Sequence, residues 1–394
     1  MRRGSTVKRM MERDTGGGTP SSERLTQKPL RDSNLELYRI LCMLLIIAHH
    51  FVVNSGLTAA DGPVYANPLS WRSLFLLLFG AWGKTGINCF MLITGYFMCT
   101  SRITARKFAK LFLEWMFYRF IIHFIFIVTG YETITLKNLI LWIIPISQIS
   151  TGFTSCFFIF FLFIPFLNVL VQHLNEKQHA LLLLLCGFTY VFLGTFHRVT
   201  MNYVSWFMVL YLIASYIRMY PKPCFTRTGL WGWLTLSAVL VSAIMVVAAT
   251  WLGNRLGRNM SFYFVTDSNT FLAVMTGVCS FLFFKNVRIP NSQFINTNAA
   301  STFGVLLIHA HSDAMRQWLW KDTLDNVGHY ADRLMPLRAI ASVLAIFIVC
   351  TCIDYLRIRF IERPLFRVLI DPALEKLQNT EKKLSNKLGL ENKQ

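Results

Sequence analysis

The sequence predicts an all-α membrane protein: a polytopic bundle of about ten transmembrane helices with both termini in the cytoplasm. Of its 394 residues, 54% are hydrophobic and only 15% are charged, whereas about 25% are charged in a typical soluble domain. Apolar runs of spanning length recur along the chain. The excess of lysines and arginines over acidic residues gives a net charge of +19, and most of these basic residues lie between the apolar runs. This pattern indicates loops that face anionic lipid, and it argues against a nucleic-acid partner.

Each predicted span is an apolar run close to the length of about 20 residues that a bilayer requires. The approximate limits are 37–54, 73–98, 111–129, 154–172, 180–196, 203–219, 230–252, 268–284, 300–319 and 337–356. A further run at 138–149 is shorter and contains Pro145. We interpret that run as interfacial or re-entrant.

The distribution of positive charge fixes the expected orientation. With the N-terminus inside, most lysines and arginines fall on cytoplasmic segments, and the outer loop 55–70 contains none. We expect residues 1–30 to be a disordered basic cytoplasmic segment, which lacks the apolar region of a cleaved signal peptide. Residues 31–368 would form the transmembrane domain. Residues 369–394 would be a cytoplasmic tail that can form a helix at the membrane surface.

The first span carries a carboxylate, a guanidinium and two imidazoles, on Glu36, Arg39, His49 and His50. Arg39 and His50 are eleven residues apart, which is about three helical turns, so both lie on one helix face roughly 16 Å apart. Glu36 lies one turn before Arg39 and can pair with it. Such groups usually face a bundle interior or a wet cavity. The alternative is a charged helix end followed by two interfacial histidines.

Polar residues also occur in the second and third spans. Thr94, Gly95 and Tyr96 allow either a close approach of helices or a break that exposes backbone groups, and we favour close packing. In the third span, Arg119 and His123 are one turn apart. Either the two side chains interact and so reduce the free-energy cost of placing ionisable groups in the membrane, or they line the same cavity as His50.

A basic segment containing Arg102, Arg106, Lys107 and Lys110 follows the second span. Lys107 and Lys110 are one helical turn apart, so both can point the same way and hold phosphate groups. The alternative is an ordinary cytoplasmic loop whose charges only set the topology.

The last two spans add a further set of polar residues. His309 and His311 lie about 200° apart around a helix, so the two histidines and Asp313 are not expected to share a metal ion. We interpret them as buried polar packing residues. After the tenth span comes Glu362, two residues before Pro364, which is expected to stop the helix.

Together these segments resemble the membrane-bound acyltransferase 3 family, over residues 31–368. That family carries an arginine or lysine and, after ten intervening residues, a histidine in the first span. It also carries an F-F-x-x-S-G-Y stretch, a basic R-x-x-R element, a late Y-x-x-H stretch and a closing E-x-P. The matching residues are Arg39 and His50, then Thr94-Gly95-Tyr96, then Lys107 and Lys110, then His309, then Glu362 and Pro364. Threonine replaces the family's serine, and two lysines replace its two arginines.

The resemblance implies a stand-alone membrane acyltransferase of surface polysaccharides, without a hydrolase-like SGNH domain. It would move an acyl group, with acetyl as the first expectation, from cytoplasmic acyl-CoA to a hydroxyl of an exported or lipid-linked glycan. We expect it in a bacterial plasma membrane. His50 would be the base, or a transient acyl carrier, with His49 second to it. Arg39, held by Glu36, would orient the donor or stabilise negative charge.

The donor phosphates would meet Lys107 and Lys110, with Arg102 or Arg106 assisting. We also expect a chamber beside His50 that opens to these cytosolic lysines. The main alternative is a transporter or flippase of a glycan or lipid intermediate, because buried ionisable groups also suit that function. No inverted repeat is apparent in the sequence, and the ionisable groups cluster early. A sensor or scaffold without chemistry would leave the histidines unexplained.

Overall fold

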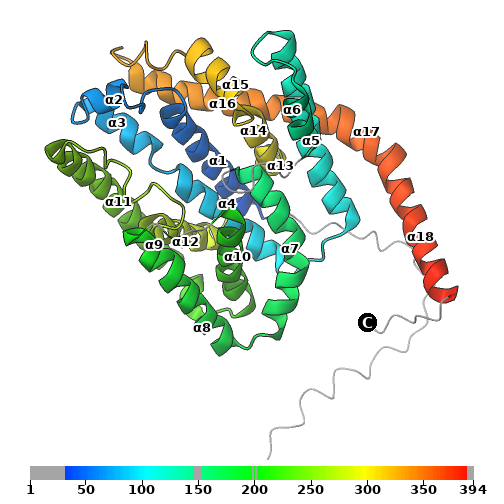
Figure 1. The fold of residues 1–394 in the computed structure, drawn as a ribbon. Coiled ribbons are helices and arrows are strands. Elements are labelled where there is room, and N and C mark those ends of the chain that lie inside the picture. The colour runs from blue at the N-terminus through cyan, green and yellow to red at the C-terminus, as the bar shows by residue number, and fades with distance from the viewer. Residues whose placement is uncertain (1–31, 145–151, 198, 200–201, 388–394) are drawn as a thin grey trace, which may run out of the picture. The chain divides into compact units, whose positions relative to one another are not determined.

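The computed structural model describes residues 32–144, 152–197, 199 and 202–387, and every regular element in these ranges is helical (Figure 1). This confirms the all-α fold class. The predicted N-terminal segment 1–30 and Pro145, in the run interpreted as interfacial or re-entrant, lie outside the described residues.

The helices follow one another with short connections. The first five are α1 (Ser33–Val53), α2 (Pro63–Ala66), α3 (Trp71–Gly80), α4 (Gly83–Met98) and α5 (Ala105–Val128). The next group is α6 (Leu136–Ile143), α7 (Phe153–His173), α8 (Glu176–Cys186), the π-helical turn η1 (Gly187–Phe192), α9 (Leu193–Phe196), α10 (Tyr203–Met219) and the 3₁₀ turn η2 (Pro223–Thr226). Then come α11 (Thr228–Leu256), α12 (Phe271–Asn286), α13 (Gln293–Ala300), α14 (Thr302–His309), α15 (Asp313–Arg316) and the π-helical turn η3 (Gln317–Thr323). The last group is α16 (Met335–Arg357), the π-helical turn η4 (Ile358–Glu362), α17 (Arg363–Leu365), the π-helical turn η5 (Phe366–Ile370) and α18 (Asp371–Lys387).

Seven helical segments of the described chain are long and apolar enough to cross a membrane. They are Ser33–Val53, Trp71–Met98, Ala105–Val128, Phe153–His173, Glu176–Phe196, Thr228–Leu256 and Met335–Glu381. Two shorter apolar helices, α10 and α12, coincide with two further predicted spans. The predicted span 300–319 is not one helix. It ends at His309, and α15 begins after Ser312, whose hydroxyl accepts a hydrogen bond from the Met315 amide as an N-cap.

The predicted span 73–98 is likewise divided, into α3 and α4. Glycines on both sides of the break allow a very close approach to α1. A Cβ added at Gly80 would lie 2.8 Å from Val52, and one added at Gly83 would lie 2.3 Å from the Cβ of His49. Any larger side chain would push the two segments apart, so the break positions the start of α4 directly against the histidine end of α1.

The chain remains helical through Pro364, contrary to the expectation that this residue stops the helix. Proline removes a backbone N–H and its ring clashes with the carbonyl four residues earlier. π-Helical turns relieve this conflict because they hydrogen-bond to the fifth residue instead. Two such turns, η4 and η5, flank α17, and the helix continues into α18 (Figure 1).

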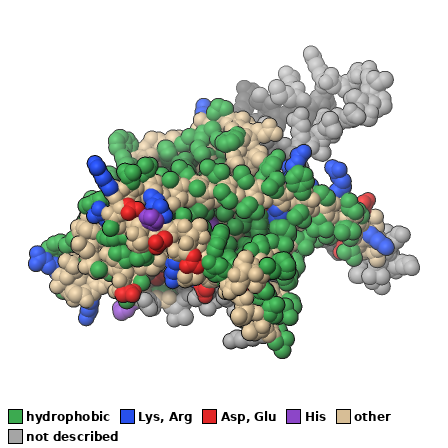
Figure 2. Space-filling model, turned by 90° about the horizontal axis from the view of Figure 1, so that it is seen from above, with side chains coloured by type: hydrophobic (Ala, Val, Ile, Leu, Met, Phe, Trp, Pro, Cys, Tyr) green, Lys and Arg blue, Asp and Glu red, His purple; other side chains and the backbone are tan. Residues whose placement is uncertain are grey.

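The first helix, α1, packs against α3, α4, α12, α13, α14 and α16. Large apolar side chains are exposed on the outward faces of other helices, for example Phe166 on α7 at 71% and Trp233 on α11 at 72%. Such apolar surface is favourable in contact with lipid tails and unfavourable in contact with water. Figure 2 shows hydrophobic side chains across the middle of one face, with charged side chains gathered toward the two ends of the view. The ionisable residues of α1 therefore lie inside the helical assembly.

Candidate active site

Two histidines from distant parts of the chain meet at the end of α1. The Nδ1 atom of His50 lies 3.1 Å from the Nε2 atom of His309, at the last residue of α14. The ring centroids are 5.2 Å apart. His50 is half-buried and His309 is buried. The ring of His50 therefore faces a partner inside the protein, not the lipid.

The hydrogen bonds of His309 determine the proton positions in this pair. His309 Nδ1 lies 2.6 Å from the carbonyl oxygen of Val305, which can only accept, so Nδ1 of a neutral His309 carries the proton. Its Nε2 atom then accepts from the Nδ1–H of His50. The lone pair of His50 is left on Nε2, which has no hydrogen-bond partner among the described residues. This is the tautomer that a general base needs.

The preceding residue, His49, also uses its Nδ1 atom for a hydrogen bond, here to the backbone. Its Nδ1 atom donates to the carbonyl oxygen of Gly80 at 2.6 Å, which leaves the lone pair on Nε2. Its ring centroid lies 5.9 Å from that of His50. His49 lines a pocket of about 650 Å³ together with Lys84, the second residue of α4.

A second cluster joins α5 to the C-terminal helix through buried ion pairs. Arg357 contacts Glu114 at 3.1 Å, Asp354 at 2.8 Å and Glu362 at 2.8 Å. Tyr118 donates a hydrogen bond of 2.8 Å to Asp354. We call Glu114, Tyr118, Asp354, Arg357 and Glu362 the Arg357 cluster. Because a buried charge must be paired, this cluster ties the two helices together.

The predicted phosphate-binding residues lie beside this cluster, but they do not act as one group. Lys110 pairs with Glu362 at 2.9 Å, and Arg106 pairs with Asp371 at 2.7 Å. The ammonium of Lys107 instead turns back to Ser101 Oγ at 2.6 Å and to the carbonyl oxygen of Arg102 at 2.9 Å. Lys107 and Lys110 therefore have different partners here, although their spacing would allow them to point the same way.

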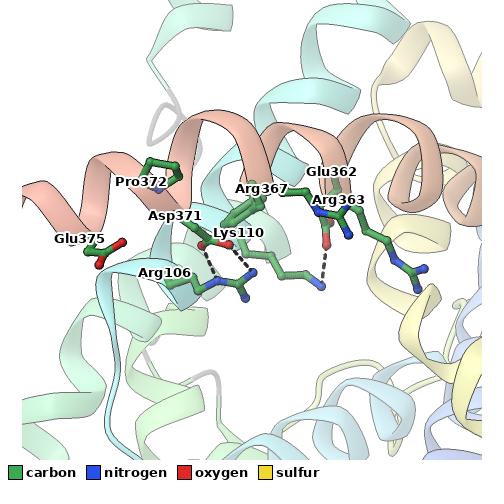
Figure 3. A pocket seen from close by; sticks show the side chains of 9 residues that line it. Arg106, Lys110, Glu362, Arg363, Arg367, Asp371, Pro372 and Glu375 are labelled. Carbon is green, nitrogen blue, oxygen red and sulfur yellow. Dashed lines mark hydrogen bonds and ion pairs between the residues drawn. The ribbon is translucent and has the colours of Figure 1, made fainter.

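Arg106 and Lys110 line a pocket of about 550 Å³ (Figure 3). The C-terminal helix contributes the other lining residues, which are Glu362, Arg363, Phe366, Arg367, Asp371, Pro372 and Glu375. Arg363 and Arg367 were not among the sequence candidates, because only folding brings them to α5. The two pockets have no lining residue in common, so they do not form the single chamber expected between His50 and the lysines.

Comparison with known proteins identifies the family. A model of an acyltransferase domain matches residues 32–355, which is most of the chain. The chain belongs to the acyltransferase 3 family. No curated protein and no solved structure matches it. Together with the seven spanning helices, this makes the protein a multi-pass membrane acyltransferase.

At the other end of α1 of this acyltransferase, Glu36 and Arg39 form an ion pair of 3.1 Å, as their spacing predicts. Glu36 is buried and Arg39 is half-buried. Arg39 lies about three turns, or roughly 16 Å along the helix, from His50. Arg39 is therefore too far along the helix to contact the His50 imidazole directly.

Arg119 and His123 fit neither alternative that their spacing left open. Arg119 donates to the backbone carbonyls of Leu141 and Trp142, at 2.5 and 2.7 Å. His123 pairs with Glu132 at 2.5 Å and stacks on Trp142 at 4.4 Å. Both residues thus fasten α6 and the preceding loop to α5. The ring of His311 contacts His123 at 4.5 Å, so His309 and His311 do face different neighbours, as predicted.

The Thr94-Gly95-Tyr96 segment of the acyltransferase serves packing. The helix α4 continues through it, and the Thr94 hydroxyl bonds to the Phe90 carbonyl at 2.9 Å. A Cβ on Gly95 would lie 2.9 Å from Ala214 on α10. The Tyr96 hydroxyl accepts a hydrogen bond of 2.8 Å from Arg218. This favours close helix approach over an exposed backbone break.

Sequence reasoning missed the partner of His50. It placed His309 among buried packing residues, although the stretch ending at His309 already resembled a family motif. It also missed Asp354, within the tenth predicted span, and Arg357, directly after that span. An aspartate and an arginine three residues apart inside an apolar run were a usable signal, because such groups need partners in a membrane.

Proposed function

We propose that this acyltransferase transfers an acyl group, with acetyl as the simplest case, from acyl-CoA to a hydroxyl of an exported or lipid-linked glycan in a bacterial plasma membrane. The observation that carries the proposal is the His50–His309 pair. It presents an imidazole lone pair that has no partner among the described residues, in a chain of this family. An imidazole nitrogen with a free lone pair is a suitable group to accept a proton from a hydroxyl.

The reaction follows from this tautomer. The Nε2 atom of His50 takes the proton of the acceptor hydroxyl while the hydroxyl oxygen attacks the thioester carbonyl carbon. The carbon–sulfur bond then breaks, and the thiolate of coenzyme A leaves with the proton returned by His50. During the step His50 carries a positive charge. Its Nδ1–H bond to His309 then becomes charge-assisted and stronger, which stabilises the transition state. An acyl group carried transiently on Nε2 would use the same lone pair.

The donor would bind at the other end, near the start of α5. Arg106 and Lys110 line the pocket there, together with Arg363 and Arg367. The pocket lining thus contains four cationic side chains and three carboxylates. Arg102 and Lys107 lie on the adjoining loop and first turn. Guanidinium and ammonium groups bind phosphates. With the N-terminus in the cytoplasm, this end faces the acyl-CoA pool. Arg39, fixed by Glu36, would orient the donor between this pocket and His50.

The test is His50→Ala in membranes supplied with radiolabelled acetyl-CoA and a glycan extract, with transfer of label measured. Removing a general base typically costs about 10²–10⁴-fold in rate, so transfer should fall by at least about 10²-fold. The matched control is His173→Ala, because His173 is exposed and bonds only to a carbonyl of its own helix. Full transfer by the His50 variant would exclude His50 as the base. No transfer by the unmodified protein would overturn the proposed function.

A further inference from the structure

The pocket beside His49 has the lining of a binding site for a polar molecule. It lies where the end of α1, the start of α4, α9 and residues 259–270 meet. Its polar side chains include Tyr65, Asn259 and Asp267, and its aromatic rings include Phe262 and Tyr263. A few polar groups set among apolar and aromatic surface are typical of small-molecule sites. Burial raises the pKa of Tyr65, which therefore stays a neutral hydroxyl donor.

Lys84 is the exceptional residue of this pocket. Its ammonium donates to the Tyr203 hydroxyl at 2.8 Å and lies 5.5 Å from the centre of the Tyr203 ring. No ion pair among the described residues includes Lys84. Asp267 also lines the pocket, but it is exposed and does not pair with Lys84. An ammonium has three donors, so the charge of Lys84 and its remaining donors are available to a ligand.

The position of Lys84 links such a ligand to the histidines. Gly83 touches His49 so closely that an added Cβ would lie 2.3 Å from the His49 Cβ. The backbone of Lys84, the next residue, therefore lies on the same side of the pocket as His49. An anion held by Lys84 would therefore lie beside His49, whose ring centroid is 5.9 Å from that of His50. Arg39, the half-buried cation at the other end of α1, has a carboxylate partner, whereas the printed partner of Lys84 is a phenol.

We propose that this pocket receives the acceptor, and that the acceptor carries an anionic group, a carboxylate or a phosphate, held by Lys84. This inference rests on the proposed function and deepens it: the substrate class becomes an acidic or phosphate-bearing saccharide. Aromatic rings and amide and hydroxyl groups contact the sugar, and Lys84 fixes the charged substituent. The reacting hydroxyl is then presented toward His49 and His50.

The test measures binding without catalysis. The purified protein in lipid nanodiscs is titrated calorimetrically with glucuronate, glucose 1-phosphate and glucose. Hydrogen bonds to a charged group contribute enough for about a tenfold change in affinity, so at least one anionic sugar should bind about tenfold tighter than glucose. Lys84→Met should remove this preference, and Lys84→Arg should keep it. Lys177→Met is the matched control, because Lys177 is exposed and lies on α8 away from the pocket lining.

Each outcome decides the inference. Preference for glucuronate alone identifies a carboxylated sugar, and preference for glucose 1-phosphate alone identifies a phosphate-bearing acceptor. Equal affinity for all three sugars, no binding of any of them, or an unchanged preference in Lys84→Met overturns the inference. Anion binding by a protein that transfers no acyl group would overturn only the proposed function. Acyl transfer with an unchanged acceptor KM in Lys84→Met would overturn only this inference.

Discussion

The Arg357 cluster and the His50–His309 pair are both built from ionisable groups buried among helices, but their hydrogen bonds are arranged differently. In the Arg357 cluster, each charged side chain has an opposite charge within 3.1 Å. In the histidine pair, each ring uses Nδ1 for a hydrogen bond, and Nε2 of His50 has no partner in the part of the chain that the structure describes. The first arrangement satisfies its charges internally. The second leaves one reactive lone pair free.

This difference separates stability from chemistry. Removing one partner of a buried ion pair leaves an uncompensated charge, which is strongly destabilising. A neutral imidazole with an open nitrogen costs less to bury and is available for proton transfer. Substitutions in the Arg357 cluster should therefore affect folding first, whereas substitutions in the histidine pair should affect activity and leave the fold intact.

The largest effect should come from Arg357→Met. This change leaves Glu114 and Asp354 without a cation, and a broken buried pair costs about 3–5 kcal/mol. Tm measured in detergent should fall sharply, together with the yield of folded protein. Arg359→Met is the matched control, because Arg359 is exposed on the same helical stretch. An unchanged Tm for Arg357→Met would show that the cluster does not hold α5 to the C-terminal helix.

The second-largest effect should come from His309, and it tests whether this residue orients the His50 ring or only packs against it. His309→Leu removes the acceptor of the His50 Nδ1–H, so the ring loses its fixed tautomer. Loss of an orienting partner should lower kcat by about two orders of magnitude, with little change in Tm. In His309→Gln the side-chain carbonyl can accept the same proton, so the loss should be smaller. Equal kcat for the Leu and Gln variants would show that the His50 tautomer does not determine the rate.

Sequence periodicity was enough to predict several of the long apolar helices and the polar faces of single helices. Apolar runs located α1, α7, α10 and α11, because a helix that crosses a membrane needs an apolar run of sufficient length in its own sequence. The Glu36–Arg39 pair was predictable because both residues lie on one helix one turn apart. Contacts between helices were not predictable in this way, since spacing says nothing about which helix faces which.

The misses follow from the same limit. His50 and His309 are 259 positions apart, and Lys110 meets Glu362 across a similar interval. The break between α3 and α4 depends on glycines that touch α1, so a window on one apolar run could not detect it. Helix continuity through Pro364 depends on π-helical turns, which leave no clear compositional mark.

The smallest effect tests whether the two regions are coupled. Gly304 lies on α14, five residues before His309, and an added Cβ would lie 2.2 Å from the Asp354 carboxylate. Asp354 cannot move easily, because Tyr118 and Arg357 both bond to it at 2.8 Å. Gly304→Ala should therefore displace α14 and with it His309. Overpacking of this kind costs about 1–3 kcal/mol, and we expect kcat to fall by about tenfold as well.

The matched control is Gly229→Ala, because Gly229 is helical and has no neighbour within 4 Å of an added Cβ. Tm and kcat should both fall in Gly304→Ala, and neither should fall in the control. A lower Tm with unchanged kcat would mean that the histidine pair keeps its geometry when α14 shifts against α16. Stability and chemistry would then be independent, although one short helix carries both Gly304 and His309.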